Sequence, residues 1–124
     1  MDTICKTADL AKPGIKAQAR EDPEPVVVCA FCRHLITEPS LQIQVNGSFY
    51  HVFANPHGIV YEIGCFSGAP GCRTSSLPSE VFSWFSGFSW QICICSGCGC
   101  HLGWRFVSDS DLFYGLILDK LIFP

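Results

Sequence analysis

Two Cys-x-x-Cys pairs are the residues of this chain whose type and spacing point most directly to a chemistry. The first pair is Cys29 and Cys32, and the second is Cys95 and Cys98, far along the sequence. Each such turn presents two thiolates from one tight loop, and two turns together complete the tetrahedral donor set that Zn²⁺ prefers. Because four thiolates leave no position open for water, we expect a structural Zn²⁺ site and no catalytic metal.

The second pair lies in a crowded cluster. Cys93, Cys95, Cys98, Cys100 and His101 all fall within nine residues. Only Cys95 and Cys98 have the two-residue spacing, so we assign them as ligands and interpret Cys93 and Cys100 as small buried apolar residues. His101 remains an alternative ligand, and a redox dithiol remains an alternative for either pair.

The other cysteines are Cys5, Cys65 and Cys72, and none of them has a partner at metal-binding spacing. Cys65 and Cys72 could form a disulfide in an oxidising compartment. The first residues lack the apolar run and the small-residue cleavage site typical of a signal peptide, and no apolar run is long enough to span a membrane. In such a chain we expect the nine cysteines to lie in a reducing compartment. We therefore expect a cytoplasmic protein.

Length and composition indicate one globular domain. The chain has 124 residues, with 48% hydrophobic and 15% charged residues and a net charge of −3, which argues against a nucleic-acid partner. Nine of the nineteen charged residues fall within the first 24, a stretch that also contains Pro13, Gly14 and Pro23. We predict a flexible arm over residues 1–24 and a folded domain over residues 25–124.

Hydrophobic alternation predicts strands and no helix. Asn46-Gly47 predicts a hairpin turn between a strand over residues 41–45 and a strand over residues 49–53, since both residues tolerate positive φ. The Gly-, Pro- and Ser-rich segment 66–79 predicts a long loop. Apolar residues occupy even positions from Phe82 to Ile94, with a bend at Ser86-Gly87. The predicted strands cover residues 41–45, 49–53, 59–66, 82–94, 102–107 and 112–123.

All three tryptophans, Trp84, Trp90 and Trp104, flank the second cysteine pair. Each indole can bury roughly 150–250 Å² of apolar surface, so a tryptophan core is the simplest interpretation. Aromatic cages also bind quaternary ammonium groups, which leaves a methyl-ammonium reader open. Acidic residues are sparse around the tryptophans, which weakens that alternative.

The local sequence around these residues resembles that of a known family. Phe82–Trp90 reads FSWFSGFSW, Cys95-x-x-Cys98 follows, and His101–Phe106 reads HLGWRF. Together with Asn55-Pro56-His57-Gly58 and Cys29-x-x-Cys32, these motifs closely resemble the thalidomide-binding (CULT) domain family of cereblon. The resemblance extends over residues 25 to 124, and the length is similar to that of the short bacterial single-domain members.

The resemblance implies a β-tent, in which two antiparallel sheets meet at an angle and are pinned by the zinc site of the four paired cysteines. It implies three cavity walls made by Trp84, Trp90 and Trp104, with Phe106 at the base. The ligands of the family are small cyclic imides, namely the glutarimide of thalidomide-type drugs and C-terminal cyclic imides on damaged proteins, and also uridine-like rings. The function implied is non-enzymatic binding, with no catalytic residues.

The imide edge would bond the backbone C=O of Phe82 and the N–H of Trp84, with Ser83 between them, while Asn55 and Pro56 would lie at the rim. Vertebrate members carry His at the position of Phe82, so we expect a different affinity or selectivity here. The chain has no length for the Lon-like domain or the adaptor-docking segment of the larger vertebrate protein. We therefore expect no ubiquitin ligase adaptor, no nucleic acid and no membrane as partners.

Two enzymatic alternatives remain. A methionine sulfoxide reductase of the B type needs a reactive cysteine in an Arg-x-Cys-x-Asn setting, and the cysteines outside the pairs, Cys65, Cys72, Cys93 and Cys100, all lack it. An imide hydrolase needs a base near the bound ring. His57 and Glu62 are the nearest candidates in sequence, although no pairing between them is visible.

Overall fold

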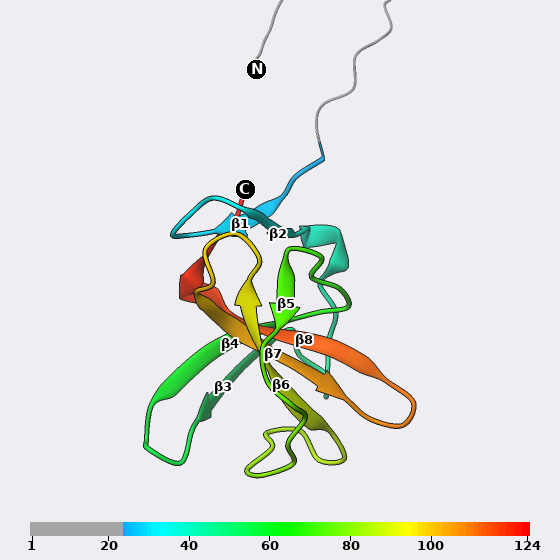
Figure 1. Cartoon of the computed structure of the whole chain (residues 1–124). Coiled ribbons are helices and arrows are strands. Elements are labelled where there is room, and N and C mark those ends of the chain that lie inside the picture. The colour runs from blue at the N-terminus through cyan, green and yellow to red at the C-terminus, as the bar shows by residue number, and fades with distance from the viewer. Residues whose placement is uncertain (1–23) are drawn as a thin grey trace, which may run out of the picture.

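The computed structural model describes residues 24–124, and the strands of this part form two antiparallel sheets (Figure 1). The predicted arm lies outside the described residues apart from Glu24, and Cys5 lies outside them too. Residues 24–124 contain strands and two short 3₁₀ helices and no α-helix. The predicted all-β class with two antiparallel sheets is therefore confirmed.

The larger sheet has six strands in the order β3-β4-β8-β7-β6-β5, and the smaller has the order β2-β1-β9 and lies across one end of it (Figure 1). The 3₁₀ helices are η1 (Pro39–Leu41) and η2 (Leu118–Lys120), and η2 carries the chain from one sheet to the other. The strands are β1 (Val27–Cys29), β2 (Leu35–Thr37), β3 (Tyr50–Ala54), β4 (Val60–Phe66), β5 (Cys72–Thr74), β6 (Ser89–Cys95), β7 (His101–Val107), β8 (Leu112–Ile117) and β9 (Leu121–Ile122).

The predicted turn at Asn46-Gly47 is confirmed, but the strand expected before it is wrong. Both turn residues have positive φ, 52° and 86°, and an isolated bridge joins Val45 to Ser48. Segment 41–45 makes only scattered bonds to the end of β4, such as that from the Ile43 N–H to the Cys65 carbonyl at 3.0 Å. Segment 41–45 then turns away from β4 toward Asn46-Gly47, so the two segments form no continuous ladder of backbone hydrogen bonds.

The strand predicted over residues 82–94 begins only at Ser89. Phe82 has a φ of 54° and Gly87 a φ of 84°, which breaks the extended backbone. The buried anchor of this loop is Phe85, at an odd position, whose ring packs against that of Phe106 at 4.8 Å. The bend predicted at Ser86-Gly87 is confirmed, but the even positions do not share one strand face, because Trp84 lies in the loop and Trp90 on β6.

Two further predictions need correction. Segment 66–79 contains the short strand β5, which pairs with β6 although its sequence lacks alternation. Segment 112–123 is split by η2 into β8 and β9, because the chain must turn to reach the smaller sheet. Strands β1 and β2 escaped prediction because three residues are too few to show a period.

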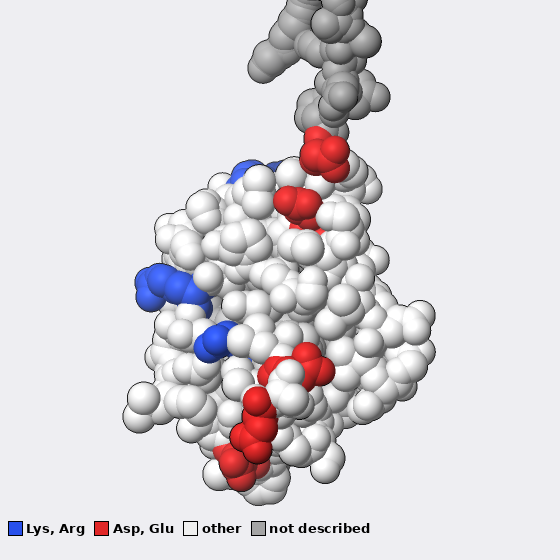
Figure 2. All heavy atoms as spheres, turned by 90° about the vertical axis from the view of Figure 1, so that its right-hand side faces the viewer, with Lys and Arg blue, Asp and Glu red and all other residues white. Residues whose placement is uncertain are grey.

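The buried residues form two clusters. One contains Val27, Ile36 and Leu102 and lies where the sheets meet, and the other contains Ile63, Phe85 and Phe113, with the three tryptophans packed against it. No helix among residues 24–124 is long and apolar enough to cross a membrane. On the face that Figure 2 shows, most of the surface is uncharged, with several acidic side chains gathered in its lower half and basic ones to the left.

Candidate functional site

The two Cys-x-x-Cys turns have the same backbone design. Cys29 ends β1 and Cys95 ends β6. In each turn, the residue four positions later donates its N–H to the carbonyl of the first cysteine, Arg33 to Cys29 at 2.9 Å and Gly99 to Cys95 at 2.8 Å. These residues have φ values of 66° and 80°, so each chain segment reverses tightly behind its thiols.

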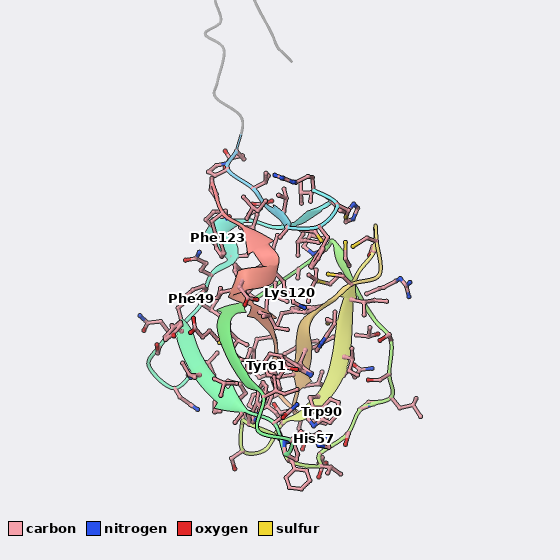
Figure 3. The ribbon with its side chains drawn as sticks, turned by 90° about the vertical axis from the view of Figure 1, so that its left-hand side faces the viewer. Phe49, His57, Tyr61, Trp90, Lys120 and Phe123 are labelled. Carbon is pink, nitrogen blue, oxygen red and sulfur yellow. The ribbon has the colours of Figure 1, made fainter. Side chains whose placement is uncertain are left out.

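The two turns bring their four thiols together. In Figure 3 the sulfur atoms lie close to one another, between the smaller sheet and the end of β6. The Sγ atoms of Cys29 and Cys98 are 3.8 Å apart, and those of Cys32 and Cys95 are 3.6 Å apart. All four lie within 4.8 Å of one another. A regular tetrahedron with metal–sulfur bonds of about 2.3 Å has edges of about 3.8 Å. The donor set therefore fits a tetrahedral metal ion such as Zn²⁺.

Electrostatics also favours a cation here. Burial opposes ionisation of Cys29, but hydrogen bonds from the backbone of Cys32 and Phe31 lower its pKa to about 7. The backbone of His34 favours the Cys32 thiolate, yet burial and the neighbouring thiols raise the pKa of Cys32 to about 12. Thiolates placed this close together would repel one another, and a positive ion between them would offset that repulsion.

His101, the alternative ligand, is not one of the four clustered donors among the described residues. Its Nε2 lies 3.1 Å from the Gly103 carbonyl oxygen, and its ring packs edge-on against that of Trp104 at 4.9 Å. Cys65 and Cys72 are both free thiols, so the structure contains no disulfide between them.

A second site is a cavity of about 330 Å³ at the other end of the molecule, where Figure 3 labels Trp90. Trp84 and Trp104 meet at one wall, with ring centroids 4.7 Å apart and planes at 73°. Phe106 is almost fully buried. The residues that line the cavity are Asn55, Pro56, Tyr61, Val81, Phe82, Trp84, Trp90, Ile92, His101, Trp104 and Phe106.

Two of the indoles are fixed to the rim by their N–H groups. Trp84 Nε1 donates to the Ala54 carbonyl at 3.2 Å, and Trp90 Nε1 donates to the Val81 carbonyl at 2.9 Å. Trp90 also exchanges two backbone hydrogen bonds with Ser79, at 2.8 and 2.9 Å. These bonds tie the β3–β4 turn and the loop before β6 to the aromatic walls.

Asn55 organises its own turn. Its Oδ1 accepts the backbone N–H groups of His57 and Ile59, both at 2.9 Å, and Gly58 completes the turn with a φ of 82°. The side-chain oxygen is therefore engaged within the turn, and the amide nitrogen is the part of Asn55 left for a bound molecule.

The cavity is neutral. No Asp, Glu, Lys or Arg is among its lining residues. Burial lowers the pKa of His101, the Gly103 carbonyl opposes this shift, and the positive charge of Lys120 adds to the lowering. A neutral imidazole at pH 7 follows, so the lining presents aromatic faces and uncharged polar groups.

Seven of the eight residues predicted to contact a ligand line this cavity. The exception is Ser83, whose hydroxyl instead donates to the Phe85 carbonyl at 3.1 Å. Sequence reasoning missed four lining residues: Tyr61, Val81, Ile92 and His101. Of these, Ile92 could have been found, because it shares a face of β6 with Trp90.

The structure does not bring the two hydrolase candidates into the cavity. His57 is exposed and is not among the lining residues. Glu62 follows Tyr61 on β4, so its side chain points to the opposite face of the sheet. On that face, burial raises the pKa of Tyr50, and the negative charge of Glu62 and its hydrogen bond with Tyr50 add to the increase.

Comparison with curated proteins identifies the family. The chain is 41% identical to the cereblon of Xenopus tropicalis over 74 residues, which are 56% of this chain and 17% of that protein. It is 40% identical to the cereblon of Drosophila melanogaster over 99 residues, which are 69% of this chain and 17% of that protein. The matched region is a cereblon-type CULT domain.

The cereblon of Gallus gallus is also similar, with 35% identity over 75 residues. That match covers 56% of this chain and 17% of the relative, so the chain corresponds to a small part of the length of these curated cereblons. No protein-family model matches the chain.

Proposed function

We propose that this cereblon-type domain is a non-enzymatic receptor for small neutral cyclic imides, such as a glutarimide, a C-terminal cyclic imide or a uridine-like ring. The observation that carries the proposal is an aromatic cavity that has three indole walls and no charged lining residue. Indole faces would remove the apolar CH₂ groups of such a ring from water, and their fixed positions keep the cost of ordering low.

The polar edge of an imide has complementary groups available. Among the hydrogen bonds within residues 24–124, none uses the carbonyl oxygen of Phe82 or the backbone N–H of Trp84. In our proposal the imide N–H donates to the Phe82 carbonyl, and an imide carbonyl accepts from Trp84. Leaving such groups unpaired on binding would cost about 1–3 kcal/mol each, so this pairing selects rings with an intact imide edge.

We assign the ligand contacts to Phe82, Trp84, Trp90, Trp104 and Phe106, with Asn55 and Pro56 at the rim and Ser83 shaping the loop between the two backbone contacts. A thalidomide-sized ligand has about 19 non-hydrogen atoms. At roughly −0.3 kcal/mol per atom, its binding free energy would be about −6 kcal/mol, a Kd on the order of tens of micromolar.

We further propose that Cys29, Cys32, Cys95 and Cys98 hold a structural Zn²⁺. The distances between their Sγ atoms support tetrahedral coordination, and four protein thiolates would leave no ligand position for substrate. The ion would tie β1 of the smaller sheet to the end of β6. Such a site would contribute folding free energy on the order of 10–16 kcal/mol by analogy with zinc-finger peptides.

The alternatives fit less well. A methyl-ammonium reader gains from carboxylates beside the aromatic faces, and the lining residues include none. Hydrolysis of a bound imide needs a base at the ring, and His101 is the one imidazole in the lining, held to the Gly103 carbonyl. The domain boundary at residue 25, the cytoplasmic location and the lack of a ligase adaptor stay predictions.

The test is a titration of the zinc-loaded full chain with thalidomide, followed by tryptophan fluorescence. Its ring-opened hydrolysis product, which lacks the closed imide, is the matched control, and tetramethylammonium tests the cation reader. We expect saturable binding of the closed ring alone. A folded, zinc-loaded sample that binds neither form of thalidomide would contradict the proposal, and selective tetramethylammonium binding would favour the reader.

A further inference from the structure

A fifth thiol lies on the neighbouring strand, directly opposite one of the four clustered cysteines. In the antiparallel pair of β5 and β6, Cys72 is the register partner of Cys95. Direct cross-strand partners project their side chains on the same face of a sheet. The two cysteines are therefore neighbours on one face, although Cys72 has no metal-binding spacing in the sequence.

The backbone hydrogen bonds show which kind of pair this is. The Ser96 N–H donates to the Gly71 carbonyl at 2.9 Å, one position beyond the two cysteines. The Cys95 N–H points away from β5 and donates to the Cys100 carbonyl at 2.9 Å. Cys72 and Cys95 thus form a non-hydrogen-bonded pair, in which the Cα atoms approach to about 4.5 Å.

That spacing suits a disulfide. Disulfides join Cα atoms about 4.4–6.8 Å apart, and the separation typical of such a pair falls within this range. Strand β5 is also packed closely against the smaller sheet. Gly71, which directly precedes β5, lies so near the backbone of Leu35 and Ile36 that a Cβ at this position would overlap the Leu35 carbonyl oxygen. The next non-hydrogen-bonded pair along the ladder joins Thr74 to Cys93, so it has the same geometry but one thiol.

We propose that Cys72 and Cys95 form a cross-strand disulfide under oxidising conditions, and that this disulfide and the four-cysteine metal site exclude each other. Cys95 cannot be a thiolate ligand and a disulfide partner at once. Its oxidation leaves three thiols in a site whose geometry needs four donors. The pair is a redox modification site that couples metal binding to the thiol–disulfide balance.

The chemistry balances with a low-molecular-weight disulfide such as glutathione disulfide as the oxidant. Cys72 is partly exposed whereas Cys95 is fully buried, so within this pair the reagent reaches Cys72 first. The Cys72 sulfur displaces one glutathione and forms a mixed disulfide. The Cys95 sulfur then attacks the Cys72 sulfur and displaces the second glutathione. Two electrons pass to the oxidant, which becomes two molecules of glutathione. Cys72 supplies one proton, and the second comes from the Cys95 thiol in the metal-free chain or from water where Cys95 is a metal-bound thiolate.

A competing reaction lies inside the cluster, where the Sγ atoms of Cys32 and Cys95 are 3.6 Å apart. Cys32 lies in an exposed turn, whereas Cys72 lies on a strand whose pairing already fixes its position opposite Cys95. Peptide mapping distinguishes the two products, because Cys95 would be cross-linked to a different peptide in each.

The test uses the zinc-loaded full chain in buffer with excess glutathione disulfide. Free zinc is followed with a chromophoric chelator, and samples are alkylated, digested and mapped by mass spectrometry. We expect metal release together with a Cys72–Cys95 cross-link. Cys72→Ser should lose this cross-link and release its metal several-fold more slowly. The matched control is Cys93→Ser, on the same face of β6, which should behave like the parent chain.

Equal release rates for the parent chain and Cys72→Ser would overturn the proposal, as would a Cys32–Cys95 cross-link as the main product. The cross-link is read by mass, so the result does not depend on imide binding. If the chain carries no zinc, the metal assignment fails, but the Cys72–Cys95 cross-link can still be measured. The two readouts therefore separate failure of the metal assignment from failure of the disulfide.

Discussion

The indole nitrogen of Trp84 lies 3.2 Å from the carbonyl oxygen of Ala54, to which it donates a hydrogen bond. Ala54 is the last residue of β3 and directly precedes Asn55, where the rim turn begins. Trp84 belongs to a loop that is distant in sequence from this turn. The bond therefore joins a wall of the cavity to its rim and fixes the position of the Trp84 indole.

Trp84→Phe should weaken imide binding more than Trp104→Phe does. Both changes keep an aromatic ring and replace the same side chain by the same smaller one, but the indole N–H of Trp104 donates no hydrogen bond to another described residue. The lost bond of Trp84 should cost about 1.4 kcal/mol, or a factor of about ten in Kd. Fluorescence from the remaining tryptophans, or calorimetry, measures both constants. Equal losses in the two variants would show that the N–H bond has no role in positioning.

The metal cluster was predictable because its information is local. A two-residue spacing between cysteines defines a turn that presents two thiols, and the structure brings the two turns together, with all four Sγ atoms within 4.8 Å of one another. The sequence motifs also identified the cereblon-type domain. Seven of the eight expected contact residues line one cavity for the same reason, since they lie within those motifs.

The parts that escaped prediction depend on contacts between distant segments. Segment 82–88 has the alternation of a strand, but the packing of Phe85 against Phe106 and Phe113 holds it as a loop. Tyr61 and His101 reach the cavity because each packs edge-on against Trp104. Nothing in the sequence near Cys72 indicates its pairing with Cys95, because a three-residue strand carries no readable period.

Cys98→Ser should release the metal and unfold the domain. A serine hydroxyl is a poor soft donor, and the remaining three thiols cannot close the tetrahedron that links the two sheets. Metal content by elemental analysis and a thermal melt measure the effect. Cys65→Ala is the control, because Cys65 is a fully buried thiol in the other core cluster. It should keep its metal and lose only about 1 kcal/mol of stability. A folded, fully loaded Cys98→Ser protein would mean that another residue supplies the fourth ligand.

Gly71→Ala should destabilise the fold strongly. A Cβ at this position would overlap the carbonyl oxygen of Leu35 and lie 2.6 Å from the Cα of Ile36, so the backbones of β5 and β2 could not both stay in place. We expect a loss of about 3 kcal/mol or more in the free energy of unfolding, measured by urea denaturation. Gly68→Ala is the control, since its Cβ would meet no atom closer than 3.7 Å. Similar losses in both variants would show that the close approach of the two strands is not required.

Stability should fall below about pH 6.5, and His101 should account for part of the loss. Burial lowers the pKa of His101 in the folded state, so the unfolded chain takes up a proton at higher pH than the folded chain does. The contribution of His101 to the free energy of unfolding therefore decreases as the pH falls from about 6.5 toward its folded-state pKa, and this contribution is constant above that window. Urea denaturation across this range measures the slope. His101→Gln should reduce this slope, because the variant has no imidazole to titrate at that position. An unaltered slope in His101→Gln would assign the pH dependence to other groups.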